Sequence, residues 1–222
     1  MKAIKVMVLG VFIFGIVVSV GKPVNAQTNL KYFAGLDLFL PGNAGDGMKA
    51  TIQAAIDAGA QGTATITTKA GIGGRIGALY SIENLADVGL SLGYIAGPTI
   101  EVSDEVDNMD VNTSFFRVLA EAQKKIKMND KWDFLGGLGL GMGFGKQEIS
   151  WTVAGFPQPP TTSYSGITWE LTAGLGYKAS DKVNVDFGLR YAGFPGVKYK
   201  TGEDPSFKVE WSTIGLFTGV SF

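Results

Sequence analysis

Hydrophobic and polar residues alternate with a period of two in eight stretches of the sequence. This period is typical of β-strands with two different faces, because successive strand side chains point to opposite sides of a sheet. The flanking segments are rich in turn-forming residues, which marks the ends of the strands. We therefore predict strands at residues 30–40, 69–82, 86–97, 111–127, 131–146, 163–178, 182–194 and 207–222.

The connections between these strands alternate between long and short. Short turns are predicted at residues 83–87, 128–130 and 179–181, and long connections at residues 41–68, 98–110, 147–162 and 195–206. Outer-membrane barrels have short periplasmic turns and long outer loops. If the first strand starts in the periplasm, the first connection is an outer loop, and an even number of strands returns the chain to the periplasm. The pattern predicts an all-β, eight-stranded, antiparallel up-and-down transmembrane barrel.

The composition of the two faces separates this barrel from a soluble β-sandwich. Along residues 131–146, large apolar side chains such as Phe134 and Leu138 alternate with Asp133, Gly137 and Gly139. Glycine weakens a strand and packs against nothing, so it suits the solvent face of a sandwich poorly. In a membrane barrel the apolar face meets lipid and the polar face lines a narrow interior, where small and charged residues fit together. The pattern favours the barrel.

Aromatic residues gather at both ends of the apolar faces. Outer-membrane barrels carry such aromatic girdles where the apolar band meets the lipid headgroups. At the predicted periplasmic ends the girdle residues are Tyr32, Tyr80, Trp132, Tyr177 and Phe222. At the predicted outer ends they are Tyr94, Phe116, Phe144 and Tyr191.

The first 26 residues read as a signal peptide that is removed after Ala26. Lys2 and Lys5 form a positive start, residues 6–20 are apolar, and residues 24–26 offer a cleavage site. A retained membrane anchor is the alternative, although the apolar run is short for a span. The remaining domain, 27–222, has 16 basic and 20 acidic residues, which gives no reason to expect nucleic-acid binding.

Composition also limits the chemistry of the chain. There is no cysteine and no histidine, so a disulfide framework, thiolate chemistry and imidazole catalysis are all excluded. A Ser-His-Asp triad cannot be built. The sequence shows no nucleotide, haem or metal motif. We therefore expect neither an enzyme nor a cofactor.

Charged residues are expected inside the barrel, because strand parity directs both signs of charge inward. An unpaired ion in a confined interior is costly, so these side chains should form ion pairs. Arg117 and Glu121 are expected to be partners, so that either single substitution destabilises the barrel more than the double substitution. A structural plug and a gated polar conduit both fit this network. The predicted members are Asp37, Arg75, Arg117, Glu121, Lys125, Glu170, Asp186 and Arg190.

Three loop segments are further candidates. Residues 101–110 are acidic and could bind calcium, but they lack the spacing and turn glycine of a calcium loop, which favours a solvated loop. Residues 48–60 have apolar positions at helical spacing, which fits a short amphipathic helix or a loop that packs on itself. Phe156 lies among prolines in residues 155–160, where it could contact a partner or a hydrophobic ligand, although such residues more often stiffen a turn.

The last strands resemble a known group of proteins. The segment LTAGLGYKASDKVNVDFGLRY at residues 171–191 resembles the penultimate hairpin of small outer-membrane barrels of the OmpA, OmpX and OmpW type. The segment IGLFTGVSF at residues 214–222 resembles their C-terminal strand. The resemblance implies location in the bacterial outer membrane among lipid and lipopolysaccharide. It also implies that the barrel-assembly machinery recognises the terminal strand and Phe222, so loss of Phe222 should impair insertion.

Two functions from different classes remain open. The first is a structural or surface-interaction barrel with a filled polar lumen, whose extracellular loops at 41–68, 98–110, 147–162 and 195–206 contact a partner. The second, implied by the resemblance to OmpW-like barrels, is a passive channel or carrier for small hydrophobic molecules. That role needs an apolar lining near the outer end and a lateral gap. The candidate lining residues are Phe33, Phe39, Ile95, Trp211 and Phe217.

Overall fold

The computed structural model describes residues 30–42, 46, 65–83, 85–103, 108–151, 161–200 and 206–222. The predicted signal peptide, the loop segment 155–160 and the predicted helix at 48–60 lie outside the described residues. In the described part of the chain, no helix is long and apolar enough to cross a membrane. The description of the fold therefore concerns the strands and the turns that join them.

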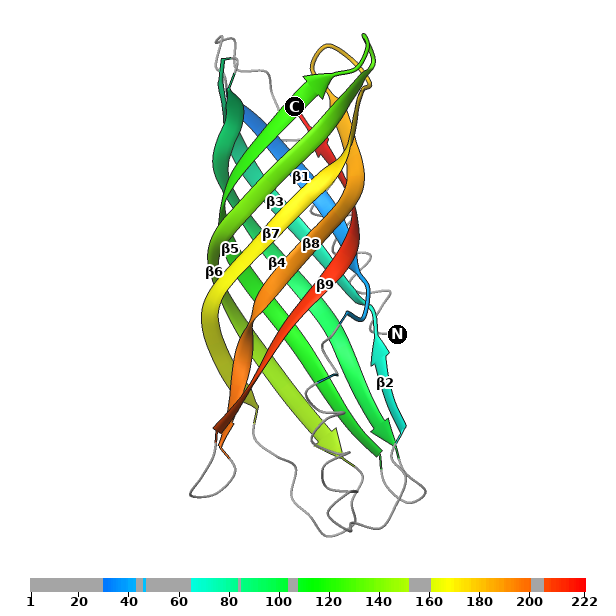
Figure 1. The fold of residues 1–222 in the computed structure, drawn as a ribbon, viewed down its shortest axis with the longest axis vertical. Helices are drawn as coiled ribbons and strands as arrows, with labels where there is room; N and C mark the ends of the chain where they lie inside the picture. The colour runs from blue at the N-terminus through cyan, green and yellow to red at the C-terminus, as the bar shows by residue number, and fades with distance from the viewer. Residues whose placement is uncertain are drawn as a thin grey trace.

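Nine strands are present in the described residues, and all are antiparallel to their neighbours. They are β1 (Leu30–Phe39), β2 (Thr65–Lys69), β3 (Gly71–Ile82), β4 (Ala86–Ser103), β5 (Asn108–Lys127), β6 (Trp132–Trp151), β7 (Thr162–Lys178), β8 (Asn184–Lys200) and β9 (Ser206–Ser221). Figure 1 shows them as one curved layer of strongly tilted strands.

The strands close into a ring with eight positions. Pairing runs from β1 through β3, β4, β5, β6, β7, β8 and β9 and back to β1. β2 and β3 are separated by Ala70 alone and both pair with β4, so together they occupy one position in the ring. The prediction of an eight-stranded up-and-down barrel is confirmed. Residues 65–68 of β2 lie in the predicted loop 41–68, so β2 is an additional piece of strand.

The two faces of the wall have the expected polarity. Leu90, Leu140 and Ile167 point outward with 62%, 58% and 67% of their surface exposed, whereas Arg117 and Glu170 point inward at 1% and 2%. A soluble barrel would bury its leucines and expose its charges. This inverted arrangement is what a lipid-facing wall with a polar interior requires.

Three predicted outer loops are wrong in their bounds, because the strands continue through much of them. β4 extends to Ser103, β6 to Trp151 and β8 to Lys200. In β4 the register shifts between Ala96 and Thr99, where Gly97 has a φ of 96°. This bulge changes the inward positions of β4 from odd-numbered to even-numbered residues. Because the alternation is interrupted there, the sequence pattern does not reveal that the strand continues.

The outer parts of β5 and β6 cannot be recognised by an apolar outward face, because their outward residues are polar. β5 and β6 each have 20 residues, about twice what a tilted strand needs to cross a bilayer. Beyond the lipid, an outward side chain meets water, so Glu148 faces out and Ile149 is partly buried. The apolar side of the alternation therefore changes face at the membrane boundary. The barrel thus projects well beyond the outer girdle.

The barrel wall divides at its outer end between β7 and β8. These strands pair from Trp169 and Gly193 down to Lys178 and Asn184. Beyond Trp169, the described pairing of β7 is with β6 alone, and that of β8 beyond Gly193 is with β9 alone. At this point Thr168 Oγ1 donates a hydrogen bond of 2.8 Å to the Gly193 carbonyl. We call this division the β7–β8 seam.

Candidate functional site in the barrel interior

A network of six charged side chains crosses the middle of the lumen. Inward positions on five strands, β1, β3, β5, β7 and β8, bring them together, because odd and even positions alternate strictly between the two faces. Three arginines face three carboxylates, so the formal charge of the network is balanced. The members are Asp37, Arg75, Arg117, Glu121, Glu170 and Arg190, each at most 8% exposed.

Glu170 on β7 is the centre of this network. Its carboxylate accepts hydrogen bonds from Arg75 at 2.9 Å and from Arg117 at 2.7 Å. The Nε atom of Arg190 lies 3.2 Å from the same carboxylate. One acid therefore contacts all three arginines, and its loss would leave an excess of buried positive charge.

The other two acids complete the pairing. Glu121 accepts from Arg75 at 3.0 Å, from Gln123 at 2.9 Å and from the Ser91 hydroxyl. This set of donors satisfies both of its carboxylate oxygens. The Glu121 side chain is therefore held from three directions.

Asp37 on β1 ties the first strand of the barrel to the network. It accepts a hydrogen bond from Arg190 and lies 3.6 Å from the Nη2 atom of Arg117. Because Arg117 contacts Glu170 and Asp37, it is not the ion-pair partner of Glu121. The predicted Arg117–Glu121 pair is wrong. Opposite strand positions lie at different heights in a staggered barrel, and local spacing along one strand does not reveal the partner.

Each arginine of the network also lies over a phenylalanine ring. The guanidinium carbons of Arg75 and Arg190 lie 5.1 Å and 4.6 Å from the ring centroids of Phe33 and Phe217. Arg117 lies 5.9 Å from the centroid of Phe39. Such contacts are cation–π interactions. Three of the five residues predicted to line an apolar ligand path therefore pack against the charges.

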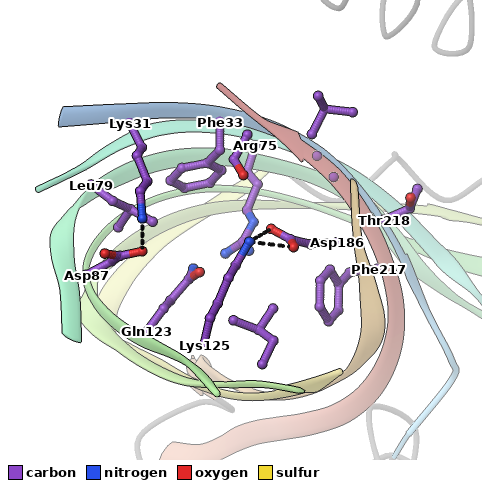
Figure 2. A pocket seen from close by; sticks show the side chains of 15 residues that line it. Lys31, Phe33, Arg75, Leu79, Asp87, Gln123, Lys125, Asp186, Phe217 and Thr218 are labelled. Atoms are coloured by element: carbon purple, nitrogen blue, oxygen red, sulfur yellow. Dashed lines mark hydrogen bonds and ion pairs between the residues drawn. The ribbon is translucent and has the colours of Figure 1, made fainter. Parts of the chain in front are cut away.

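Two further ion pairs lie on the side of the network toward the predicted periplasmic end. Lys31 contacts Asp87 at 2.9 Å, and Lys125 contacts Asp186 at 2.6 Å. Figure 2 shows these four side chains and the rings of Phe33 and Phe217 pointing into the ring of strands. The cavity that they surround has a volume of about 30 Å³. That volume holds about one water molecule, which is too little for a continuous pore.

An apolar cluster fills the lumen on the outer side of the network. Phe115 packs edge-on against Phe194 at 5.1 Å, and Phe194 packs in the same way against Phe39 at 5.8 Å. We call this the outer apolar cluster. Its buried members are Phe39, Ile95, Ile100, Val111, Phe115, Ala192 and Phe194. The predicted lining residues Phe39 and Ile95 belong to this cluster, and the side chain of Trp211 lies outside the described residues.

Of the predicted girdle residues, Tyr32, Tyr80, Tyr94, Phe116, Phe144 and Tyr191 are 42–52% exposed on the outer wall. At the periplasmic end, Trp132 packs against Tyr177 with ring centroids 4.9 Å apart. Phe222 and Tyr32 form two backbone hydrogen bonds of 2.9 Å with each other. Phe222 therefore extends the pairing of β9 with β1.

The predicted acidic loop is mostly strand. Residues 101–103 belong to β4 and residues 108–110 to β5, while residues 104–107 lie outside the described residues. Glu101 and Asp110 are cross-strand neighbours, and Lys69 on β2 forms an ion pair with Glu101. In the described part of the chain, no group of three potential metal-binding side chains occurs.

Sequence reasoning missed several interior residues. Strand parity alone would have found Lys31, Asp87 and Phe115, because each lies on the same face as a predicted interior residue. Ile100 could not be found in this way, since it follows the bulge that reverses the faces of β4. Cation–π stacking leaves no sequence signal, because the partners lie on strands far apart in the chain.

A comparison with protein families agrees with this architecture. A family model described as an outer membrane protein beta-barrel domain matches residues 40–216, well over half of the chain. The comparison with curated proteins gives no match. Among solved structures, the chain is similar to Neisserial surface protein A, at 13% identity and a TM-score of 0.46, over 87% of this chain and 96% of that one.

Two other solved structures are similar at the same low level. OprG from Pseudomonas aeruginosa shares 13% identity at a TM-score of 0.44, over 87% of this chain and 95% of that one. Ail from Yersinia pestis, solved with the heparin analogue sucrose octasulfate, shares 16% identity at a TM-score of 0.42, over 87% and 98% of the two chains.

Proposed function

The chain belongs to the outer membrane protein beta-barrel family, and from this premise we propose that it is a non-conducting barrel that serves as a structural or surface-interaction protein. The observation that carries the proposal is the filled lumen. The six-charge network closes its middle, and the cavity beside the network holds about 30 Å³. A path for ions or solutes would require these buried, mutually paired side chains to separate, which is costly in a confined space.

The outer projection is the proposed site of interaction. β5 and β6 are about twice as long as a membrane crossing needs, and their outer halves present polar side chains such as Asp110, Asn112 and Glu148. Surface loops on a rigid scaffold are common sites of binding. The proposed role needs no catalysis, in keeping with a sequence that lacks histidine and cysteine.

Current recordings in planar lipid bilayers test the closed lumen. We expect the refolded full chain to insert without producing discrete conductance steps. The double variant Arg75→Ala/Glu121→Ala removes one cation and the carboxylate that it contacts at 3.0 Å. The remaining network has no net charge, but its side chains fill less of the lumen. This variant is expected to conduct. Conductance steps from the folded wild-type protein would overturn the proposal.

A second function is favoured by the β7–β8 seam. The seam begins at Trp169, whose ring lies 5.2 Å from that of the predicted girdle residue Tyr191. Behind it lies the outer apolar cluster, with Phe194 and Phe115 in contact. A break in the backbone pairing beside an apolar interior supports this function, because a carrier of small hydrophobic molecules needs a lateral route through its wall. Such a carrier does not require an open polar pore.

A spin-labelled ten-carbon alkane tests this second function in lipid nanodiscs. If it enters through the seam, it should broaden the NMR ring signals of Phe115 and Phe194. The ring signals of Phe33 and Phe217, on the other side of the charge network, should broaden much less. Replacement of the exposed Ile167 by lysine should reduce the broadening, and the control Asn112→Lys should not. Equal broadening of all four rings would argue against a carrier.

A further inference from the structure

A groove of about 730 Å³ lies on the outer wall of the barrel across β4, β5, β6 and β7. Most of its lining residues point away from the interior, while Phe115, Gly145 and Tyr164 belong to the inward face of the wall. We call it the outer groove. Its lining includes Tyr94, Phe116, Phe144, Ser114, Lys146 and Ser163.

The register of the strands arranges these side chains in two parallel rows. Phe116 is opposite Tyr94 on one side and opposite Phe144 on the other. Two residues farther out, Lys146 lies between Ser114 and Ser163 in the same manner. Directly opposed side chains in a sheet have Cβ atoms about 5 Å apart, so each row presents its groups together.

The position of the two rows relative to the membrane defines what they meet. The aromatic row belongs to the outer girdle, which lies at the level of the lipid headgroups. The row of Ser114, Lys146 and Ser163 lies farther from the apolar band and therefore among the headgroups of the outer leaflet. This row presents one ammonium group between two hydroxyl groups. The aromatic row lies next to it, on the side of the apolar band.

Lys146 is the charge available to a ligand in this groove. It is exposed and forms no ion pair among the described residues. Glu148 lies one row farther out on the same face, opposite Asn112. An anion in the groove would therefore approach Lys146 from the membrane side, and the carboxylate of Glu148 would weaken its binding.

We propose that the outer groove binds the phosphorylated sugar headgroup of lipopolysaccharide from the outer leaflet. An ammonium group with adjacent hydroxyl donors binds a phosphate by charge-assisted hydrogen bonds. The aromatic row packs against the apolar part of the same lipid. This site depends on the orientation of the barrel in the outer membrane and not on whether the lumen is closed.

Native mass spectrometry of the refolded full chain with diphosphoryl lipid A tests the site. We expect Lys146→Gln to weaken binding about tenfold, which corresponds to about 1.4 kcal/mol. Lys124→Gln serves as the matched control, because Lys124 is an exposed lysine on β5 toward the periplasmic end. Glu148→Gln is expected to strengthen binding several-fold, which is an effect of opposite sign.

A second lipid separates phosphate recognition from general affinity for lipid. Dephosphorylated lipid A should bind the wild-type protein as weakly as diphosphoryl lipid A binds the Lys146→Gln variant. Circular dichroism checks that each variant is folded, and substitution of an exposed lysine should not change the spectrum. Equal binding of both lipids, or equal weakening by Lys146→Gln and Lys124→Gln, would overturn the proposal.

Discussion

Replacement of Glu170 by leucine is expected to lower the free energy of unfolding by about 3–5 kcal/mol. Glu170 contacts Arg75 at 2.9 Å, Arg117 at 2.7 Å and Arg190 at 3.2 Å, and it is 2% exposed. Without its carboxylate, three buried arginines share the two acids that remain. The uncompensated charge in the lumen is the cause of the loss. Urea unfolding of the barrel in lipid vesicles measures it.

The double variant Arg117→Leu/Glu170→Leu provides the critical comparison. It removes one charge of each sign, so the remaining four charges are balanced. The double variant should therefore be more stable than Glu170→Leu alone, although it lacks one more polar side chain. If it is the less stable of the two, charge balance does not determine the stability of the lumen.

An exposed ion pair supplies the control for this series. Lys127 and Asp130 contact each other at 2.8 Å, but their side chains are 62% and 96% exposed. Water and salt screen such a pair, so Lys127→Ala should change the free energy of unfolding by less than about 1 kcal/mol. An equally large loss at Lys127 would show that the assay does not distinguish buried pairs from exposed ones.

Substitution of Gly141 by alanine is expected to destabilise the barrel by about 1–3 kcal/mol. Gly141 points inward on β6, where an added Cβ would lie 1.8 Å from the carbonyl oxygen of Val118 and 2.9 Å from the Cα atom of Leu119. Both atoms belong to the backbone of the neighbouring strand. β5 and β6 would have to separate locally to accept the methyl group.

Gly136 on the same strand provides the matched control. An added Cβ there would lie 3.9 Å from the nearest atom, on the ring of Phe134, which is ordinary contact. Gly136→Ala should be neutral or slightly stabilising, because alanine costs less conformational entropy than glycine in a strand. The same urea measurement compares the two variants. Similar free energies for both would rule out crowding of the interior as the reason for the glycines.

The strand-long alternation of the sequence was enough to identify the barrel. Because strand side chains alternate strictly, parity placed Arg117, Glu170 and Phe217 inside and Leu140 and Phe144 outside. The short turns and the aromatic girdles then gave the orientation. None of these inferences needs a contact between distant residues.

The partners within the site could not be predicted in the same way. Glu121 is the expected partner of Arg117 when β5 is considered alone, but both carboxylates that Arg117 contacts lie on other strands. The ion-pair partner of Arg117 depends on the shift in hydrogen-bond register from strand to strand around the ring. This shift sets the height of each inward side chain along the barrel axis. The stacking of Phe39 on Arg117 depends on the same shift.

The sequence by itself therefore determined the class of fold and, up to the outer girdle, the two faces of each strand and the residues that enter the interior, because these follow from the period of a single strand. The tertiary structure alone decided the extent of the outer projection, the seam between β7 and β8 and the pairing around Glu170. A bulge at Gly97 and a change of solvent from lipid to water interrupt the alternation, and ring closure brings together side chains that no local pattern connects.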